Sequence, residues 1–291
     1  MSKPGSRYDT LFGCATGVGG RAVVLGVPYD RGTHPLHAGA AGAPATLRRL
    51  SAPTHCRADR HGIYDHARKE RVLAAEAFSD LGDVRFRVRR PDAEYLDQIA
   101  DATRVLAQEG RKPVLLGGDH LITLPSLRGI AKAIGPVQMV QVDAHHDYER
   151  LEEGEVPMHA SFVSHLVREG LVARVVQVGI RGYDWGEAPA PEGVVGARPE
   201  DVGRALLPGV PVYVSIDTDA FDPTVAGAVN FPEPEGLTLT DLDMVLAQAR
   251  MAGSLIGADW TEYNPNLDTK NSLTGLFILR GLIRVLRALV A

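Results

Sequence analysis

Short apolar runs, rich in β-branched residues and bounded by turn residues, recur along the chain. Within each run the apolar positions are continuous and do not alternate with polar ones, which is typical of strands buried on both faces of a parallel sheet. The runs cover residues 21–30, 112–120, 135–147, 173–184, 210–223 and 253–265. We therefore expect each of them to contribute a buried strand to one sheet.

Stretches with apolar residues at helical spacing separate several of these runs. Helices are predicted over residues 92–110, 159–170, 238–253 and 272–291, the last of them long and amphipathic. For residues 238–253 we expect Thr240 to be the N-cap, with Asp243 three residues later resembling part of a capping box. Because alternating strands and helices require crossover connections, the pattern predicts an α/β fold with a mostly parallel sheet.

Two longer stretches, residues 30–90 and 186–209, show neither pattern and are expected to be irregular. The glycine-rich residues 13–20 precede a strand, whereas a phosphate-binding loop follows one, and no Lys-Ser or Lys-Thr pair comes after them. The sequence contains no repeat and no obvious linker. We therefore expect one domain that spans residues 1–291.

The composition is that of an ordinary globular protein, with 45% hydrophobic and 23% charged residues. The net charge of −5 argues against a nucleic-acid partner, and the basic run at residues 85–90 is interpreted as a solvated edge. Cys14 and Cys56 have neither zinc-site nor disulfide spacing, which favours a reducing compartment. Since there is no signal-peptide pattern and no apolar stretch of membrane-spanning length, we expect a cytoplasmic protein without a membrane partner.

Polar clusters follow four of the predicted strands, always at the carboxyl end. They are Asp119–His120, the group Asp143, His145 and Asp147, the group Asp217, Asp219 and Asp222, and Glu262. Parallel strands bring their carboxyl ends to the same side of a sheet, where ligands of α/β proteins bind. We therefore expect these clusters to converge on one site.

The spacing within two of the clusters narrows this expectation. Asp143, His145 and Asp147 are two residues apart, so in an extended chain their side chains share one face and His146 points away from it. The two acids of residues 217–219 have the same spacing. Together with the histidine of the GGDH motif, four carboxylates and two imidazoles are expected at one end of the sheet.

Four acids so close together would repel one another, and several would have to be protonated without a counter-charge. A single Asp–His pair after a strand is usually a cap or a loop hydrogen bond, but its repetition at matching strand ends favours metal ions. Six nitrogen and oxygen ligands are enough for two divalent cations if carboxylates bridge them. Such a site suits Mn²⁺, with Fe, Co, Ni and Zn left open.

Three motifs, GGDH (residues 117–120), DAHHD (143–147) and SIDTDAFDP (215–223), resemble the signature motifs of the ureohydrolase family, the arginases, agmatinases and their relatives. The resemblance extends to LGVPYDRGT (25–33), GLTL and GADWTEYNP (257–265) and covers most of the chain. It implies a three-layer α/β/α sandwich, two Mn²⁺ ions and a homotrimer or homohexamer. It also implies hydrolysis of a guanidino compound to urea and an amine.

Carried over residue by residue, the resemblance assigns roles to the clustered side chains. The implied metal ligands are His120, Asp143, His145, Asp147, Asp217 and Asp219. Glu262 matches the acid that faces the guanidinium group, and His159 lies where the family has a histidine near the leaving amine, although Ala160 follows it instead of glycine. A metal-activated water would attack the guanidinium carbon, and Asp147 would carry a proton to the leaving nitrogen.

Several positions depart from the family pattern. His146 and Tyr148 stand where smaller residues are usual, and Leu121 stands where serine is usual. Trp260 and Tyr263 replace small aliphatic residues. This bulk either narrows the pocket or packs behind the sheet, and the sequence leaves both interpretations open.

The choice of substrate depends on segments around the motifs. Asp184, with Glu187, is a candidate for binding an amino group of the substrate, as acids in the corresponding loop of arginases do. The segment NFPEPEGL (230–237) looks more like agmatinases, so we favour an agmatinase-like hydrolase of a linear amidine. The alternatives are a hydrolase of formimino or other amidino compounds, a deacetylase-type metal amidohydrolase, a two-metal phosphoesterase and a non-catalytic relative.

Overall fold

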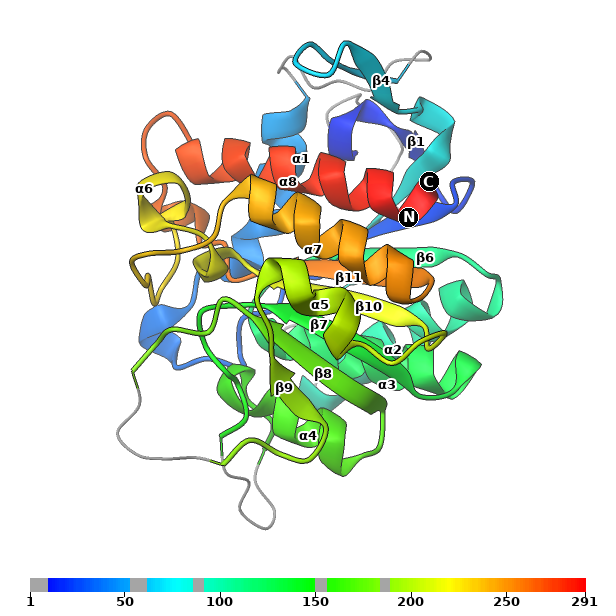
Figure 1. Ribbon diagram of the computed structural model, residues 1–291. Helices are drawn as coiled ribbons and strands as arrows, with labels where there is room; N and C mark the ends of the chain where they lie inside the picture. The colour runs from blue at the N-terminus through cyan, green and yellow to red at the C-terminus, as the bar shows by residue number, and fades with distance from the viewer. Residues whose placement is uncertain (1–9, 53–61, 86–91, 150–155, 184–188) are drawn as a thin grey trace.

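Nine parallel strands form one central sheet in the computed structural model, which describes residues 10–52, 62–85, 92–149, 156–183 and 189–291. Their spatial order is β1-β5-β2-β6-β11-β10-β7-β8-β9, and every neighbouring pair is parallel (Figure 1). The strands are β1 (Ala15–Thr16), β2 (Ala22–Gly26), β5 (Phe78–Asp83), β6 (Lys112–Leu116), β7 (Val137–Val142), β8 (Val172–Val178), β9 (Val194–Gly196), β10 (Val212–Asp217) and β11 (Leu255–Thr261). The predicted mostly parallel sheet is confirmed.

The six strands predicted from apolar runs, β2, β6, β11, β10, β7 and β8, are consecutive neighbours in the middle of the sheet. Their side chains alternate between two apolar cores, one on each face. In β10, for example, Val214 and Ile216 belong to one core and Tyr213 to the other. Because both faces are covered, the strands are largely apolar, and their few polar side chains are buried.

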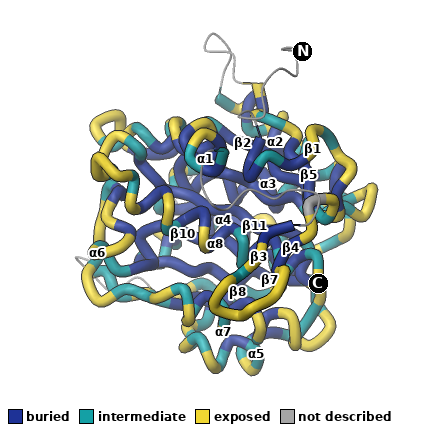
Figure 2. Tube along the Cα trace, turned by 90° about the horizontal axis from the view of Figure 1, so that it is seen from above, coloured by how far each residue is buried: buried dark blue, intermediate teal, exposed yellow. Residues whose placement is uncertain are grey.

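Helices cover both faces of the sheet, which confirms the predicted three-layer arrangement (Figure 1). One core includes side chains of α1 (Ala43–Ser51), α5 (Val202–Ala205), α6 (Pro223–Ala226), α7 (Leu239–Ala252) and α8 (Leu273–Val290). The other includes side chains of α2 (Asp92–Gln108), α3 (Thr123–Ile134) and α4 (Phe162–Arg168). Figure 2 shows the buried residues concentrated along the strands and the exposed ones in the surrounding loops. Within the described ranges, no helix combines the length and apolar character needed to cross a lipid bilayer.

The expectation that residues 30–90 and 186–209 are irregular is wrong. The first stretch contains α1, β5 and a small antiparallel pair of strands, β3 (Ile63–Asp65) and β4 (Glu70–Leu73), and the second contains β9 and α5. β5 lacks the apolar pattern because it carries Ser79 and Asp80, which are buried but hydrogen-bonded to Gly20 and Arg48. β9 has three residues, too few to show a pattern.

Helix α7 begins earlier than the sequence predicts, because its N-cap is Thr238 and not Thr240. The Thr238 hydroxyl accepts a hydrogen bond from the Asp241 N–H at 3.3 Å, and the Asp241 carboxylate accepts one from the Thr238 N–H at 2.8 Å. Two overlapping Thr-x-x-Asp patterns fit a capping box equally well. The first is used because Leu237, directly before it, is held in a parallel bridge with Phe221.

Candidate active site

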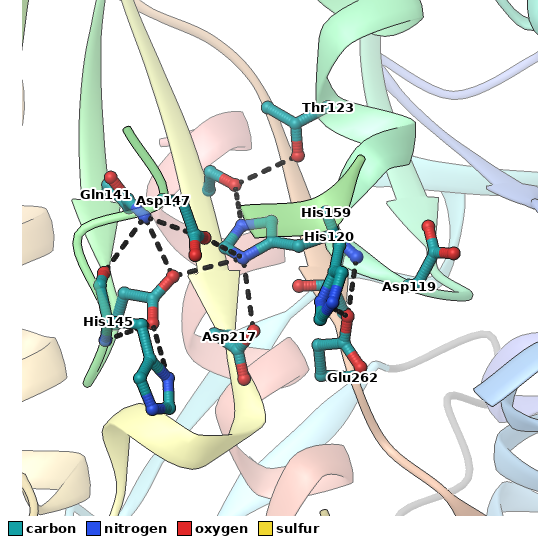
Figure 3. A network of polar contacts seen from close by, with 12 residues as sticks. Asp119, His120, Thr123, Gln141, His145, Asp147, His159, Asp217 and Glu262 are labelled. Atoms are coloured by element: carbon teal, nitrogen blue, oxygen red, sulfur yellow. Dashed lines mark hydrogen bonds and ion pairs between the residues drawn. The ribbon is translucent and has the colours of Figure 1, made fainter. Parts of the chain in front are cut away.

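Four neighbouring strands carry most of the predicted site residues to one place at their carboxyl ends. Asp222 is the exception, because it caps α6 and accepts a hydrogen bond from the Thr224 N–H at 2.9 Å. β6, β11, β10 and β7 lie side by side in the sheet. GGDH, the acid of GADWTEYNP and DAHHD follow β6, β11 and β7, and SIDTDAFDP begins in the last residues of β10. Figure 3 shows His120, Asp147, Asp217 and Glu262 meeting there. The common direction of the strands thus brings together clusters that are far apart in the sequence.

His120 lies at the centre of a first group of possible ligand atoms. Its Nδ1 atom is 3.0 Å from Asp143 Oδ2, 3.1 Å from Asp217 Oδ2 and 3.2 Å from Asp147 Oδ2. This nitrogen is buried, and none of the three contacts has hydrogen-bond geometry. Its other ring nitrogen, Nε2, is hydrogen-bonded to Ser215 Oγ at 2.8 Å. A buried imidazole nitrogen that faces three carboxylate oxygens is the arrangement expected of ligands around a cation.

A second group of possible ligand atoms consists of Asp143, His145 and Asp219. His145 Nδ1 is 3.0 Å from Asp219 Oδ2 and 3.8 Å from Asp143 Oδ1. In this group, and in the group of His120, Asp143 and Asp147, the ligand atoms lie within 4.8 Å of one another. Asp143 belongs to both groups and turns one oxygen toward each histidine, so it could serve as a ligand in both.

The DAHHD segment reaches the site by a bend and not by continuing the strand. β7 ends at Val142, and Asp147 has a left-handed backbone conformation with φ of 51°. The prediction that the side chains of this segment alternate along a strand is therefore wrong. His146 does not point away but lines the same cavity as His145 and Asp147, and its ring stacks on Tyr148 at a centroid distance of 4.0 Å.

Without metal ions, the side chains around this cluster do not balance the negative charges of its carboxylates. Burial and the charge of Asp143 raise the pKa of Asp147 to about 8. Burial and the charges of Asp219 and Asp143 hold the pKa of Asp217 well above its usual range. Burial lowers the pKa of His145, but its hydrogen bond to Asp219 and the nearby carboxylates raise it to about 9. Protons therefore occupy atoms that would otherwise bind metal, and the donor set fits divalent cations.

Glu262 and His159 form a pair beside the ligand cluster (Figure 3). Glu262 Oε1 accepts a hydrogen bond from the His120 N–H at 2.8 Å and lies 3.4 Å from His159 Nδ1. Burial lowers the pKa of His159, but the hydrogen bond to Glu262 and the charges of Asp147 and Asp119 raise it to about 9. His159 is thus protonated near neutral pH and can donate a proton.

A cavity opens onto both ligand groups. Its outer wall includes His146, Glu149, Ala160, Ile180, Gly182 and Phe231. The Phe231 ring lies between histidines, with centroid distances of 4.8 Å to His37 and 6.1 Å to His159. The wall is therefore partly apolar, and Glu149 adds a carboxylate to it.

Trp260 and Tyr263 pack behind the site and not in its mouth, which answers the question that the sequence left open for these two residues. The Trp260 ring stacks on Phe221 at a centroid distance of 5.6 Å, and its far edge fills the space that a side chain at Gly281 of α8 would need. The hydroxyl of Tyr263 donates to Asp268 at 2.7 Å. Both side chains are at most 2% exposed, so their bulk changes the core and not the pocket.

The remaining residues considered from the sequence are Asp184, Glu187 and Arg181. Asp184 and Glu187 lie outside the described residues. All the hydrogen bonds described for the Arg181 guanidinium go to main-chain oxygens. Arg181 donates to the carbonyl oxygens of Gly179, Asp219, Ala220, Glu233 and Pro234. It is therefore not available to clamp a phosphate, which removes support from the phosphoesterase alternative.

Three residues of the site were not singled out from the sequence: Phe231, Gln141 and Asp259. Asp259 is buried behind His120 and accepts hydrogen bonds from Ser215 at 2.7 Å, Thr123 at 2.8 Å and Tyr213 at 2.9 Å. The sequence feature that could have identified Asp259 is an acid in the middle of an apolar run. It orients the hydroxyl that contacts His120 Nε2 and so belongs to the support of the imidazole.

Comparisons with known proteins agree with this geometry. A model of the arginase family matches residues 20–285 of the chain. The sequence is 32% identical to the mitochondrial arginase of Medicago truncatula over 94% of this chain and 82% of that protein. It is also 32% identical to the guanidinobutyrase of Pseudomonas aeruginosa, over 92% of this chain and 87% of that protein. The crystal structure of a hypothetical agmatinase from Burkholderia thailandensis has the same fold, with a TM-score of 0.80 at 24% identity over 100% of this chain and 96% of that one. The chain therefore belongs to the arginase family and is a metal-dependent ureohydrolase.

Proposed function

We propose that the chain hydrolyses a guanidino compound to urea and an amine, using two divalent cations. The residues that would hold them are His120, Asp143, His145, Asp147, Asp217 and Asp219. The observation that carries the proposal is the pair of ligand groups that share Asp143. Four carboxylates to two imidazoles favour Mn²⁺ as the metal. When bound, the cations supply an activated water as the nucleophile and stabilise the negative charge that develops during its attack.

The side chains beside the cations would bind the guanidinium group and move the protons. The Glu262 carboxylate offers two oxygens to the planar guanidinium group, a pairing that fits both shapes. Asp147 would accept a proton from the attacking water and pass it to the leaving nitrogen. His159, which is held near Glu262 at 3.4 Å, would be a second proton donor to the departing amine.

The outer wall of the cavity favours a substrate whose tail carries an amine. The main chain of Glu149 is held on both sides, because its N–H donates to Ala160 O at 3.1 Å and its carbonyl accepts from Ser164 Oγ at 3.0 Å. Glu149 is among the residues that line the cavity, whereas no arginine or lysine is among them in the described ranges. A negative wall attracts an ammonium group and repels a carboxylate. We therefore favour an agmatinase-like substrate over a guanidino acid.

Three further properties stay predictions from the sequence. They are a single domain over residues 1–291, assembly as a homotrimer or homohexamer, and a cytoplasmic location. Analytical ultracentrifugation of the purified chain at several concentrations would measure the number of subunits in the oligomer.

A panel of substrates tests the reaction and the tail together. Purified chain loaded with Mn²⁺ would be assayed for urea release from agmatine, arginine, guanidinobutyrate and guanidinopropionate, and for formamide release from a formimino acid. We expect agmatine to be turned over fastest. Glu149→Gln should lower kcat/KM for agmatine by about fivefold, because it removes an exposed charge contact, and should leave metal binding unchanged.

Two results would contradict this proposal at different levels. Fastest turnover of guanidinobutyrate, unaffected by Glu149→Gln, would show that the assignment of the tail is wrong. Release of formamide and no urea would show that the guanidino substrate itself is wrong.

A further inference from the structure

Two buried glutamines, Gln141 of β7 and Gln177 of β8, lie directly behind the metal-ligand cluster. They are register partners in neighbouring parallel strands, and they are 0% and 5% exposed. Gln177 Nε2 donates to Gln141 Oε1 at 2.8 Å and to the carbonyl oxygen of His146 at 2.7 Å. Amide groups inside a sheet are unfavourable unless they are hydrogen-bonded, and here each bonds the other or the loop that carries the ligands.

The contact with Gln177 determines which end of the Gln141 amide faces the site. Because Gln141 Oε1 accepts from Gln177, Gln141 Nε2 points toward the carboxylates (Figure 3). It donates to Asp143 Oδ2 at 2.8 Å and to Asp147 Oδ2 at 3.2 Å. The reversed amide would place its oxygen against two carboxylates, which is electrostatically unfavourable.

The carboxylate oxygens held by Gln141 belong to one ligand group. They are the atoms that lie 3.0 Å and 3.2 Å from His120 Nδ1. The other oxygen of Asp143, Oδ1, accepts from the His145 N–H at 2.7 Å and faces the second group. Gln141 Nε2 also contacts the main-chain carbonyl oxygen of His145 at 3.4 Å, but among the described contacts it reaches neither the His145 ring nor Asp219.

We propose that Gln141 is a positioning residue that selectively strengthens cation binding by the group of His120, Asp143 and Asp147. Gln177 acts through it, by fixing the direction of its amide. This inference rests on the proposed two-cation site. Hydrogen bonds that orient metal ligands typically change metal affinity by about 10–100-fold. Both carboxylate oxygens that Gln141 contacts face His120, so we expect its loss to weaken that group most.

Binding of Mn²⁺ to the metal-free full chain, measured by equilibrium dialysis with quantification of the metal, tests the inference. Gln141→Met keeps the length of the side chain and removes the N–H donor. We expect one of the two dissociation constants to rise about 10–100-fold and the other to stay within about threefold of wild type. Gln177→Met, which contacts no ligand, should raise the same constant by a smaller factor.

Gln138→Met is the matched control. Gln138 is also fully buried in β7, but its amide donates at 2.9 Å to the carbonyls of Leu207 and Val210, away from the site. Both constants should stay at their wild-type values in this variant. An equal change in Gln138→Met would show that any lost amide has this effect and would overturn the inference.

Other outcomes separate the inference from the function on which it rests. Unchanged constants in Gln141→Met, or an equal rise of both, would overturn the inference alone. Wild-type protein that binds no Mn²⁺ would overturn the proposed function and this inference with it. If circular dichroism shows that Gln141→Met does not fold, Gln177→Met provides the test. A rise of one dissociation constant alone supports the inference, and two unchanged dissociation constants refute it.

Discussion

At the scale of single residues, Glu262 combines a contact inside the protein with a proposed role in binding substrate. One of its oxygens accepts from the main-chain N–H of His120 and faces His159. Its backbone adopts a left-handed conformation with φ of 61°. A non-glycine residue in this conformation is strained, and such strain is often found at functional sites, where the surrounding structure maintains it.

Glu262→Gln should separate these two roles. The amide oxygen can still accept from the His120 N–H, so we expect the metal content to stay at the wild-type value. The charge that would pair with the guanidinium group is lost, so kcat/KM for the best substrate should fall by about two orders of magnitude. Steady-state kinetics with metal analysis of the same preparation would measure both. Wild-type kinetics in this variant would contradict the role of Glu262.

At the scale of elements, the start of α7 shows that a local capping pattern does not by itself determine which residue is the N-cap. Thr238 and Thr240 each stand three residues before an aspartate. The position of the preceding loop against η8 (Thr218–Ala220), where Leu237 N–H donates to Ala220 O at 2.9 Å, selects Thr238 as the cap. The same contact ties α7 to the loop that carries Asp219.

Thr238→Ala should lower the free energy of unfolding by about 1 kcal/mol, because it removes an N-cap hydroxyl. Urea denaturation of the metal-free chain would measure the loss. Thr240→Ala is a suitable control, since Thr240 lies in the first turn, is exposed and makes no cap. Its unfolding free energy should stay within about 0.5 kcal/mol of wild type. A larger loss from Thr240→Ala than from Thr238→Ala would show that the cap is misassigned.

At the scale of the whole molecule, the parallel sheet concentrates negative charge at one end of a chain whose net charge is only −5. In the metal-free protein this concentration raises the pKa of Asp147 to about 8 and that of Asp219 to about 6, by burial and the charge of Asp143. The pKa of His145 rises to about 9, against the effect of burial, through Asp219 and the other carboxylates. Folding without metal therefore takes up protons.

The stability of the metal-free chain should consequently fall as the pH rises. A group whose pKa is raised by folding stabilises the protein fully below its unfolded pKa and loses this contribution as the pH rises through its folded pKa. For Asp147 and His145 the loss extends up to about pH 8 and about pH 9. Since cations replace these protons, the difference in Tm between Mn²⁺-loaded and metal-free chain should widen from about pH 6 to about pH 8.5. Thermal denaturation monitored by circular dichroism would measure it, and a difference that narrows over this range would contradict the assignment.

The sequence by itself determined the class of the fold and the chemistry of the site. Largely apolar runs predicted the six central strands, because burial on both faces leaves few polar positions in them. The positions of the acids and histidines after those runs predicted a common site, because parallel strands end on the same side. β5 and β9 were beyond this reasoning, since buried polar residues in β5 and the shortness of β9 hide the pattern.

Only the tertiary structure decided how the side chains around the ligands are arranged. The bend at Ala144 and His145 precedes His146, which lines the cavity, and the neighbouring strand β8 supplies Gln177 to orient Gln141. Helix α8 provides the glycine surface on which Trp260 packs away from the pocket. Each of these arrangements depends on a contact between segments far apart in the sequence or on a backbone turn without a glycine to signal it. Local patterns report burial and spacing, so they identify the ligands but not the contacts that hold them in place.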